Sequence, residues 1–397
     1  MLYVYEDLHA LDLEPLSLTR ATFELRCGAC SHIERIRRIV GDQPLTLIVR
    51  QQLAVVVQER LPELPVNPEK VEAGQWLNGA ALWSETAWGR LQGISGYLAT
   101  GDHITGANLS AEESTEFYRL LQAGKEPQVS PAATDGPKLL SFLWDHFLSN
   151  SEVVTADFER WYRDQAATSF GQGVHVIGDQ GVYLGEGVTI DPAVVLDTRH
   201  GPIIIDDGTS VGSFAVIAGP TYLGPKCKIW PYAFLEAVSF GPVCRAMGQV
   251  VESIMQGFTN KQHDGFLGHA YLGSWVNLGA GTTNSDLKNN YGDVKVVVNG
   301  RSVNSGSRFV GCFLGDHAKS AIGTLFYTGT RVGVCANVFG HVTPPKVVPS
   351  FAWGGDGKER YDLEKCLDTM AVVKGRRGEE LTEAERALYT RLYAENV

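Results

Sequence analysis

The sequence lacks the features of several large classes of protein. It has no apolar run long enough to cross a bilayer, and residues 1–7 carry acids where a secretory signal has a basic flank and an apolar stretch. Basic residues are in the minority, since 34 Lys and Arg stand against 45 Asp and Glu, a formal charge of −11. Seven cysteines, an odd number scattered over 397 residues, do not suit a disulfide framework. We therefore expect a cytoplasmic globular protein that binds neither nucleic acid nor a membrane.

Glycine is abundant and unevenly distributed. Of 44 glycines, 28 lie within residues 171–345 and only 16 in the other 222 positions. Glycine at this density serves turns, and a turn that recurs at a fixed interval indicates a repeat architecture.

The glycine-rich region contains a repeat of six residues. An aliphatic residue returns at every sixth position, with one three-residue shift after the third: Leu184, Ile190, Leu196, Ile205, Val211, Ile217, Leu223, Ile229 and Leu235. The register resumes at Phe266, Leu272 and Leu278 and again at Val332 and Val338. An antiparallel β-sandwich would alternate with period two, so the pattern favours a parallel β-helix of hexapeptide repeats with stacked aliphatic ladders.

The chain on either side has a different composition. Residues 1–135 mix β-rich and amphipathic helical pieces and predict a small α/β domain, and residues 136–168 predict linker helices. The β-helix is expected over residues 169–345. Residues 346–397 predict a charged tail with a closing helix from Leu381 to Ala394, capped by Thr382.

Residues 260–282, NKQHDGFLGHAYLGSWVNLGAGT, carry a resemblance to a known family. The segment resembles the acetyltransferase half of the bacterial bifunctional N-acetylglucosamine-1-phosphate uridyltransferase and glucosamine-1-phosphate acetyltransferase. Residues 284–291 (NSDLKNNY), residues 351–355 (FAWGG) and both chain ends resemble a divergent branch named as sugar nucleotidyltransferases. The resemblance implies a left-handed β-helix, homotrimers that hold acetyl-CoA between subunits, and an amino-sugar phosphate or nucleotide-sugar acceptor.

The resemblance also implies roles for individual residues. His263 lies at the family's interval before Val276 and would be the general base, a role that suits imidazole near neutral pH. Asn277 would contact substrate or the oxyanion, or would be an internal asparagine that satisfies turn carbonyls. Gly279 and Ala280 would lie where the thioester end of CoA approaches. The expected acceptor contacts are Lys261, Tyr291 and Lys295.

The sequence departs from the family at two places. Phe266 replaces a tyrosine, and the arginine expected near residues 233–236 is missing, although Arg245 is close in sequence. His269 competes with His263 as the base because it lies six residues on, in the same phase of the repeat. His263 could also be a turn histidine bonded to a backbone carbonyl.

The N-terminal region resembles sugar-phosphate nucleotidyltransferases in a degraded form. Residues 15–35, PLSLTRATFELRCGACSHIER, match the family's phosphate-binding segment, and Arg20 and Arg26 are candidate phosphate ligands or solvated charges. The glycine-rich loop is absent, because residues 5–14 contain no glycine, and Thr22 replaces a lysine. We read Cys27 and Cys30 as buried residues at a helix start. Mg²⁺ is implied only if this domain is active, with Glu6 or Asp102 as candidate ligands, and no other metal is assigned.

Three functions therefore remain open. The first is an acetyl-CoA-dependent N-acetyltransferase with an impaired nucleotidyltransferase domain. The second is a sugar-1-phosphate nucleotidyltransferase that uses the β-helix to trimerise. The third is a non-catalytic trimer that binds a sugar nucleotide.

Overall fold

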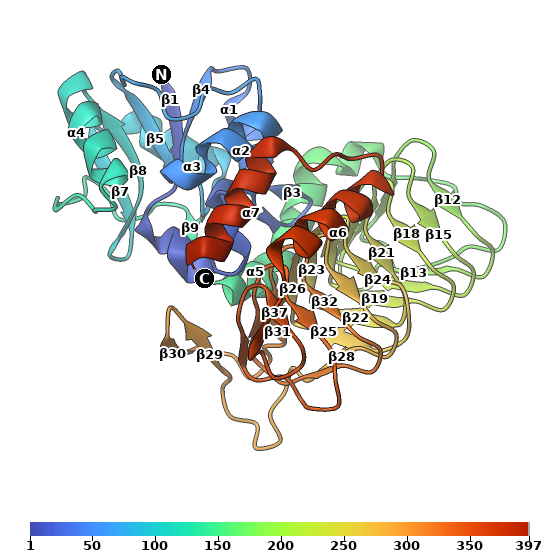
Figure 1. Ribbon diagram of the computed structural model, residues 1–397. Coiled ribbons are helices and arrows are strands. Elements are labelled where there is room, and N and C mark those ends of the chain that lie inside the picture. Colours follow the sequence, from blue (N-terminus) through green and yellow to red (C-terminus); the bar gives the residue numbers. More distant parts are fainter. Residues whose placement is uncertain (396–397) are drawn as a thin grey trace. The chain divides into compact units, whose positions relative to one another are not determined.

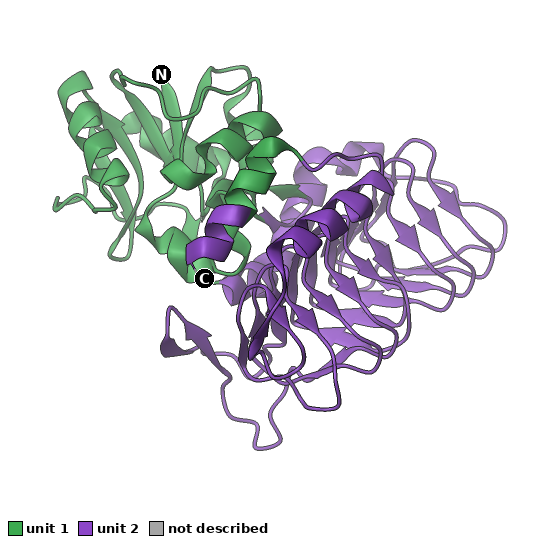
Figure 2. Ribbon diagram, in the orientation of Figure 1, with its two compact units in different colours: residues 1–25, 30–142, 382–389 green, residues 26–29, 143–381, 390–397 purple. Residues whose placement is uncertain are grey.

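The computed structural model describes residues 1–395, which divide into two compact units (Figure 2). The first comprises residues 1–25, 30–142 and 382–389. The second comprises residues 26–29, 143–381 and the C-terminal segment from residue 390. Within the described residues, every helix is too short or too polar to cross a membrane.

The first unit is an α/β fold around a five-stranded sheet. Its strand order is β4-β1-β5-β8-β7, with β1 parallel to β4 and β5, and β8 antiparallel to β5 and β7. These strands are β1 (Leu2–Tyr5), β4 (Leu45–Ile48), β5 (Gly74–Asn78), β7 (Gly96–Thr100) and β8 (His103–Leu109). The helices are α1 (His32–Val40), α2 (Ala54–Arg60), which follows η4 (Gln51–Leu53), α3 (Glu85–Gly93) and α4 (Ala111–Gln122). The predicted α/β class is confirmed.

Aromatic side chains form the core of this unit. Trp76 is fully buried, stacks on Tyr3 with ring centroids 4.2 Å apart, and meets the edge of Phe117 at 5.1 Å. A short pair of strands, β6 (Ala81–Leu82) and β9 (Lys138–Leu139), lies outside the main sheet.

The cysteines of the chain are buried thiols, and none of the seven forms a disulfide. Cys27 ends β2 (Arg26–Cys27), and Cys30 begins β3 (Cys30–Ser31), which leads directly into α1. The prediction that these two residues are buried at a helix start is confirmed.

The segment after β1 folds as consecutive 3-10 helices, η1 (Leu8–Leu13), η2 (Leu16–Leu18) and η3 (Thr22–Glu24). Its backbone amides bond within the segment: Ala10 N–H donates to the Asp7 carbonyl and Glu14 N–H to the Leu11 carbonyl. Arg50 donates to the carbonyl of Ser17 at 2.7 Å. The segment is thus held by its own turns and by side chains from elsewhere in the unit.

The second unit is a parallel β-solenoid of about ten turns, the predicted left-handed β-helix (Figure 1). Its three faces are sheets of stacked strands. The first is β10 (His175–Ile177), β13 (Val195–Asp197), β16 (Val216–Ala218), β19 (Phe234–Glu236), β22 (Gln249–Val251) and β25 (Phe266–Gly268). The second is β11 (Val182–Leu184), β14 (Ile203–Ile205), β17 (Thr221–Leu223), β20 (Ser239–Phe240), β23 (Ile254–Gly257), β26 (Tyr271–Ser274), β31 (Cys312–Leu314), β34 (Thr330–Val332) and β36 (Val347–Val348). The third is β12 (Thr189–Ile190), β15 (Ser210–Val211), β18 (Lys228–Ile229), β21 (Arg245–Ala246), β24 (Asn260–Lys261), β27 (Asn277–Leu278), β32 (Lys319–Ser320), β35 (Asn337–Val338), β37 (Ala352–Trp353) and the antiparallel β38 (Glu359–Arg360).

The hexad ladder of the sequence is the interior of this solenoid. Predicted aliphatic residues pair with aliphatic residues a full coil away, as in Leu184 with Ile205 and Leu196 with Ile217. The buried ladders merge into one continuous apolar core. The predicted register is wrong by one residue at Phe266, because Leu267 pairs with the buried Val250 and fills the core instead. Coils of unequal length between these strands account for that shift.

The chain has further elements besides the stacked coils. Helix α5 (Leu143–Trp161) and η5 (Arg163–Gln165) lie in the segment for which linker helices are predicted, and α5 buries Val154 and Phe158 against β14 and β17. An insertion carries the hairpin of β29 (Lys295–Val298) and β30 (Arg301–Asn304), and β28 (Thr283–Asn284) pairs with β33 (Leu325–Phe326). Helix α6 (Leu363–Gly375) lies along the outside of the rungs (Figure 1). The predicted closing helix is α7 (Glu383–Glu395), and Thr382 Oγ1 accepts the Glu385 amide as its cap.

Candidate functional site

An outward-facing column of polar side chains crosses the third face of the solenoid. Because strand residues alternate, each inward ladder residue of β21, β24, β27 and β32 has an outward neighbour, and these outward neighbours pair in register. They are Arg245, Asn260, Asn277 and Lys319. Asn277, predicted from the motif to contact substrate, is exposed and lies in the middle of this column.

The column forms one wall of a cavity of about 260 Å³. Its other lining residues come from the adjoining turns and from the end of α6: Gln262, Trp275, Val373, Arg376 and Arg377. Arg377 donates to Asn260 Oδ1 at 2.9 Å, and Asn260 Nδ2 lies 3.4 Å from Asn277 Oδ1. A hydrogen-bonded chain therefore runs from α6 to the motif asparagine.

The electrostatics of this cavity favour an anion. Four of its lining side chains are cationic and none of those lining residues is acidic. Burial lowers the pKa of Arg377, and the positive charges of Arg245 and Arg376 lower it further. Burial also lowers the pKa of Lys319. An anionic ligand would relieve this mutual repulsion, and forked guanidinium groups suit phosphate oxygens.

A second, mostly apolar groove of about 350 Å³ adjoins the cavity through a shared residue, Gln262. It is lined by Trp230, Pro231, Tyr232, Met247, Gln262 and His263. His263 is exposed in the turn after β24, and its backbone carbonyl accepts a 2.5 Å hydrogen bond from Lys261 Nζ. The backbone of this turn is therefore bonded to Lys261, at the edge of an apolar surface.

His269, the competing base, contacts a carboxylate and two aromatic rings. Its Nδ1 is 2.9 Å from Asp286 Oδ2, and its ring stacks on Phe309 at 5.2 Å and meets Phe147 edge-on at 5.8 Å. A carboxylate on one ring nitrogen fixes the tautomer and leaves the other nitrogen to accept a proton. The sequence motifs did not single out Asp286, although it belongs to the 284–291 string that carried the resemblance.

The chain matches known proteins over parts of its length. Residues 2–165 match the family described as sugar nucleotidyl transferase. A bifunctional sugar-1-phosphate nucleotidylyltransferase/acetyltransferase of Sulfurisphaera tokodaii is 29% identical over 136 residues, 34% of this chain and 33% of that protein. GlmU of Synechococcus elongatus is 33% identical over 44% of this chain and 42% of its own, and GlmU of Nitrosospira multiformis 26% identical over 41% and 42%. Over these parts of its length, the chain is similar to GlmU proteins. The matches span a third to two fifths of the length of these relatives.

Two of the residues expected near CoA in a GlmU-like site lie at the turn after β27. A Cβ on Gly279 would come 2.5 Å from the Ala321 carbonyl carbon, so close stacking of the coils requires glycine here. The Gly279 amide donates to the Ser320 carbonyl at 3.0 Å, and the Ala280 carbonyl accepts from Gly323. These backbone groups already form hydrogen bonds within the solenoid. They therefore offer a ligand van der Waals contact rather than hydrogen bonds.

The GlmU-like acceptor residues are not gathered in one place. Tyr291 and Lys295 are exposed on the insertion, outside the linings of the cavity and groove described above. Lys261 occupies a ladder position inside the solenoid, 2% exposed, where Nζ donates to the carbonyls of Met247 and His263. Burial lowers the pKa of Lys261 to about 8.

The arginines of the GlmU-like N-terminal motif are also buried. Arg20 is 6% exposed, and its carbonyl accepts from Arg50. Arg26 is 6% exposed, donates to the Ala29 carbonyl, and lies 5.6 Å over the Tyr222 ring. Both arginine side chains are therefore packed inside the protein rather than exposed to solvent.

Proposed function

We propose that the chain is an acetyl-CoA-dependent N-acetyltransferase acting on an amino-sugar phosphate or a nucleotide sugar, with its site on the solenoid. The observation that carries this proposal is the cationic cavity containing Asn277, joined through Gln262 to the apolar groove that contains His263. Residues 260–282, which resemble the acetyltransferase half of the bifunctional uridyltransferase and acetyltransferase family, contribute to both linings. One relative named for acetyl transfer matches 34% of the chain.

The chemistry assigns separate tasks to the cavity and the groove. Acetyl-CoA would supply the acyl group and carries phosphate charges of its own. The cationic side chains, Arg245, Lys319, Arg376 and Arg377, would hold phosphate oxygens, and the apolar groove would take an uncharged part of a ligand. Gly279 and Ala280 would leave room for the thioester end at the coil edge.

Proton transfer requires one histidine. An amine attacks a thioester only as the free base, so a neutral imidazole must take its proton. His263 would do this from the groove, and Asn277 would donate its amide N–H to the developing oxyanion. Lys261, Tyr291 and Lys295 remain proposed acceptor contacts, with Lys261 acting through the turn of His263. Phe266 in place of a tyrosine suits an acceptor with one fewer hydrogen-bonding group.

A homotrimer belongs to this proposal. Tyr232 and Phe214 are 68% and 55% exposed and stack on each other at 5.2 Å, so one subunit displays aromatic surface beside the groove. A neighbouring subunit would cover that surface and close the site.

The test is release of CoA thiol from acetyl-CoA with a panel of amino-sugar phosphates. We expect H263A to lose about 10²–10⁴-fold in kcat, the usual contribution of a positioned base. R245Q should raise the KM for acetyl-CoA with a smaller effect on kcat. H175A, an exposed histidine on β10, is the matched control and should be unaffected.

The competing base gives a distinct outcome. If H263A retains turnover while H269A and D286N lose it, the base is His269 and the site lies one hexad along. If wild type turns over no acceptor yet binds a sugar nucleotide, the third hypothesis, a non-catalytic binding trimer, takes over.

A second candidate function is sugar-1-phosphate nucleotidyl transfer, because the family match covers residues 2–165. We propose that this activity is impaired. The amides that would cradle a triphosphate are engaged in η1, and Glu6 cannot readily serve Mg²⁺ because Arg50 binds Oε1 at 2.9 Å and Thr22 N–H binds Oε2 at 3.2 Å. Asp102, the other candidate ligand, is exposed in the turn between β7 and β8. Arg20 and Arg26 would have to leave packed positions to reach a phosphate.

A further inference from the structure

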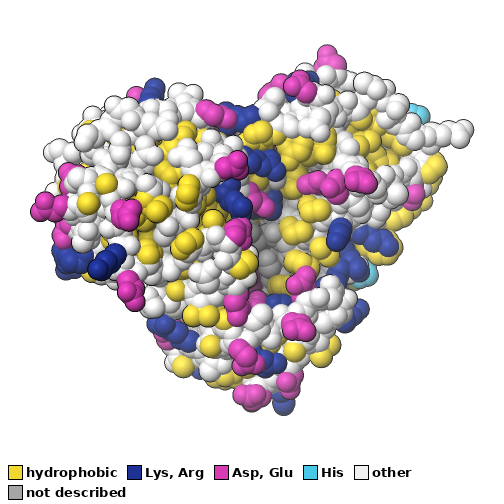
Figure 3. All heavy atoms as spheres, turned by 90° about the horizontal axis from the view of Figure 1, so that it is seen from above, with side chains coloured by type: hydrophobic (Ala, Val, Ile, Leu, Met, Phe, Trp, Pro, Cys, Tyr) yellow, Lys and Arg dark blue, Asp and Glu magenta, His cyan; other side chains and the backbone are white. Residues whose placement is uncertain are grey.

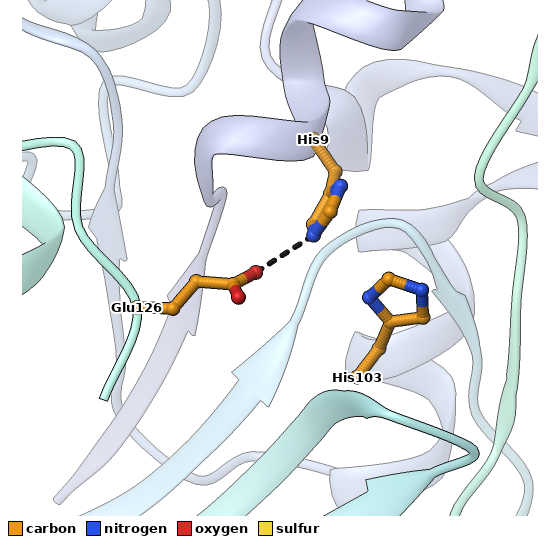
Figure 4. Close-up of side chains that lie close together, drawn as sticks. All are labelled: His9, His103 and Glu126. Atoms are coloured by element: carbon orange, nitrogen blue, oxygen red, sulfur yellow. Dashed lines mark hydrogen bonds and ion pairs between the residues drawn. The ribbon is translucent and has the colours of Figure 1, made fainter. Parts of the chain in front are cut away.

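A cluster of metal-ligand side chains lies in the first unit, outside every residue assigned above. His9 comes from η1, His103 begins β8, and Glu126 follows α4. Their ligand atoms all lie within 4.8 Å of one another. Figure 4 shows the Glu126 carboxylate pointing at His9 Nε2, with the His103 ring beside them; Glu126 Oε1 and His9 Nε2 are 2.7 Å apart.

The spacing suits a small tetrahedral cation after slight adjustment. Two nitrogen or oxygen ligands at about 2.0 Å from Zn²⁺ lie roughly 3.3 Å apart. The observed separations run from a 2.7 Å hydrogen bond to the 4.8 Å limit, so movements of about an ångström would bring the three together. The His9 and His103 rings are perpendicular at 4.6 Å, so they do not obstruct each other by stacking.

The surroundings hold His9 in place for such a role. Its backbone N–H donates to Asp7 Oδ1 at 2.9 Å, and Asp7 Oδ2 accepts from Asn78 at 2.7 Å. Its other ring nitrogen, Nδ1, lies 3.8 Å from Asp12 Oδ2. This contact is longer than a hydrogen bond, and a small movement would let Asp12 act as the outer-shell carboxylate that commonly orients a ligating histidine. An ion pair between His9 and Glu126 alone would explain neither the proximity of His103 nor that of Asp12.

We propose that His9, His103 and Glu126 bind one divalent transition-metal ion of the zinc type, leaving a fourth position open. Two imidazoles and one carboxylate form a ligand set that zinc accepts with an open position. Beside it, Asp7, Leu8 and Gly124 help to line a cavity of about 300 Å³. Water or an anionic oxygen of a small ligand would complete the coordination.

The test uses full-length, tag-free protein stripped with a chelator and then dialysed. Zn²⁺ titration by calorimetry should give one site per chain, and Co²⁺ should give the visible absorption of a four-coordinate ion. Because all seven cysteines are buried, that spectrum should lack the intense near-ultraviolet bands of cobalt–thiolate bonds. A wild-type protein that takes up neither ion overturns the proposal, and so do thiolate bands, because they would mean that cysteine holds the metal.

Variants distinguish metal ligation by these three side chains from a general effect of negative charge on Zn²⁺ binding. H103A and E126Q should weaken Zn²⁺ binding by more than the ~10–100-fold expected of an outer-shell change such as D12N. E126Q alters an exposed side chain and should fold normally, which thermal unfolding would verify. E116Q, an exposed glutamate on α4, is the matched control and should bind like wild type. Equal affinity in wild type, H103A and E126Q would refute the site.

Discussion

The buried lysine in the ladder should make the stability of this protein depend on pH in a specific direction. Lys261 stands where neighbouring coils place Ala246 and Leu278, and its exposed fraction is 2%. Burial lowers its pKa from 10.5 to about 8, with the charge of Asp264 acting weakly in the opposite sense. The folded state therefore disfavours the charged ammonium, and the lysine lowers stability wherever it is protonated.

The size of the effect follows from the two pKa values. Each pKa unit is worth 1.36 kcal/mol, so a fall from 10.5 to about 8 costs about 3 kcal/mol at pH 7. The unfolded chain binds more protons than the folded one between about pH 8 and 10.5, so the penalty fades as the pH rises through this window. The K261M variant removes this penalty, but it also removes two hydrogen bonds that stabilise the folded state by ~0.5–1.5 kcal/mol each.

We expect the free energy of unfolding of K261M, minus that of wild type, to be near or above zero at pH 7. That difference should then fall by about 2–3 kcal/mol by pH 10. Urea unfolding at several pH values and one protein concentration measures it. K228M, an exposed outward lysine two coils away, is the control and should show no such trend. A K261M difference that is constant from pH 7 to 10 would refute the buried-charge reasoning.

Two further predictions concern assembly and the first unit. Light scattering at micromolar concentration should report a homotrimer, since Phe214 and Tyr232 would otherwise remain exposed; a monomer would contradict any site shared between subunits. Pyrophosphate release from UTP and a hexosamine 1-phosphate, with Mg²⁺ present, should be undetectable or very slow, because phosphoryl transfer depends on positioned donors and the η1 amides are already engaged; rapid release would contradict this.

The solenoid could be predicted from sequence because its coils repeat. A period-six ladder position such as Val211 needs no long-range information, and Val211 pairs with Ile229 as expected. Both surfaces of the candidate site were harder to predict. Arg245, Asn260 and Asn277 are 15 and 17 residues apart, and Lys319 joins them only after the 42-residue excursion through the insertion. Arg377, at the end of α6, lies in a segment that has no hexapeptide repeat.

Charge across the protein is mixed, so composition did not indicate a cationic cavity either. Basic and acidic side chains both occur on the face shown in Figure 3, in line with the modest excess of acids. A local group of four cations is invisible in a formal charge of −11. The His9 cluster was missed for the same reason: its members come from three segments, and pattern reasoning about ligands depends on short spacings.

The ladder itself distinguishes the coils that line the cavity. Ladder positions of β12, β15 and β18 are Ile190, Val211 and Ile229, whereas β24 and β32 place Lys261 and Ser320 inward, on either side of Leu278. Ser320 Oγ bonds Thr282 Oγ1 at 2.8 Å, so this polar ladder residue is hydrogen-bonded but contributes less apolar burial than an aliphatic one. The outward residues of the same strands are Asn260, Asn277 and Lys319. In these coils, polar residues stand in place of apolar ladder residues, and the outward side chains line the cavity. This is the pattern expected where some local stability is lost in favour of a binding site.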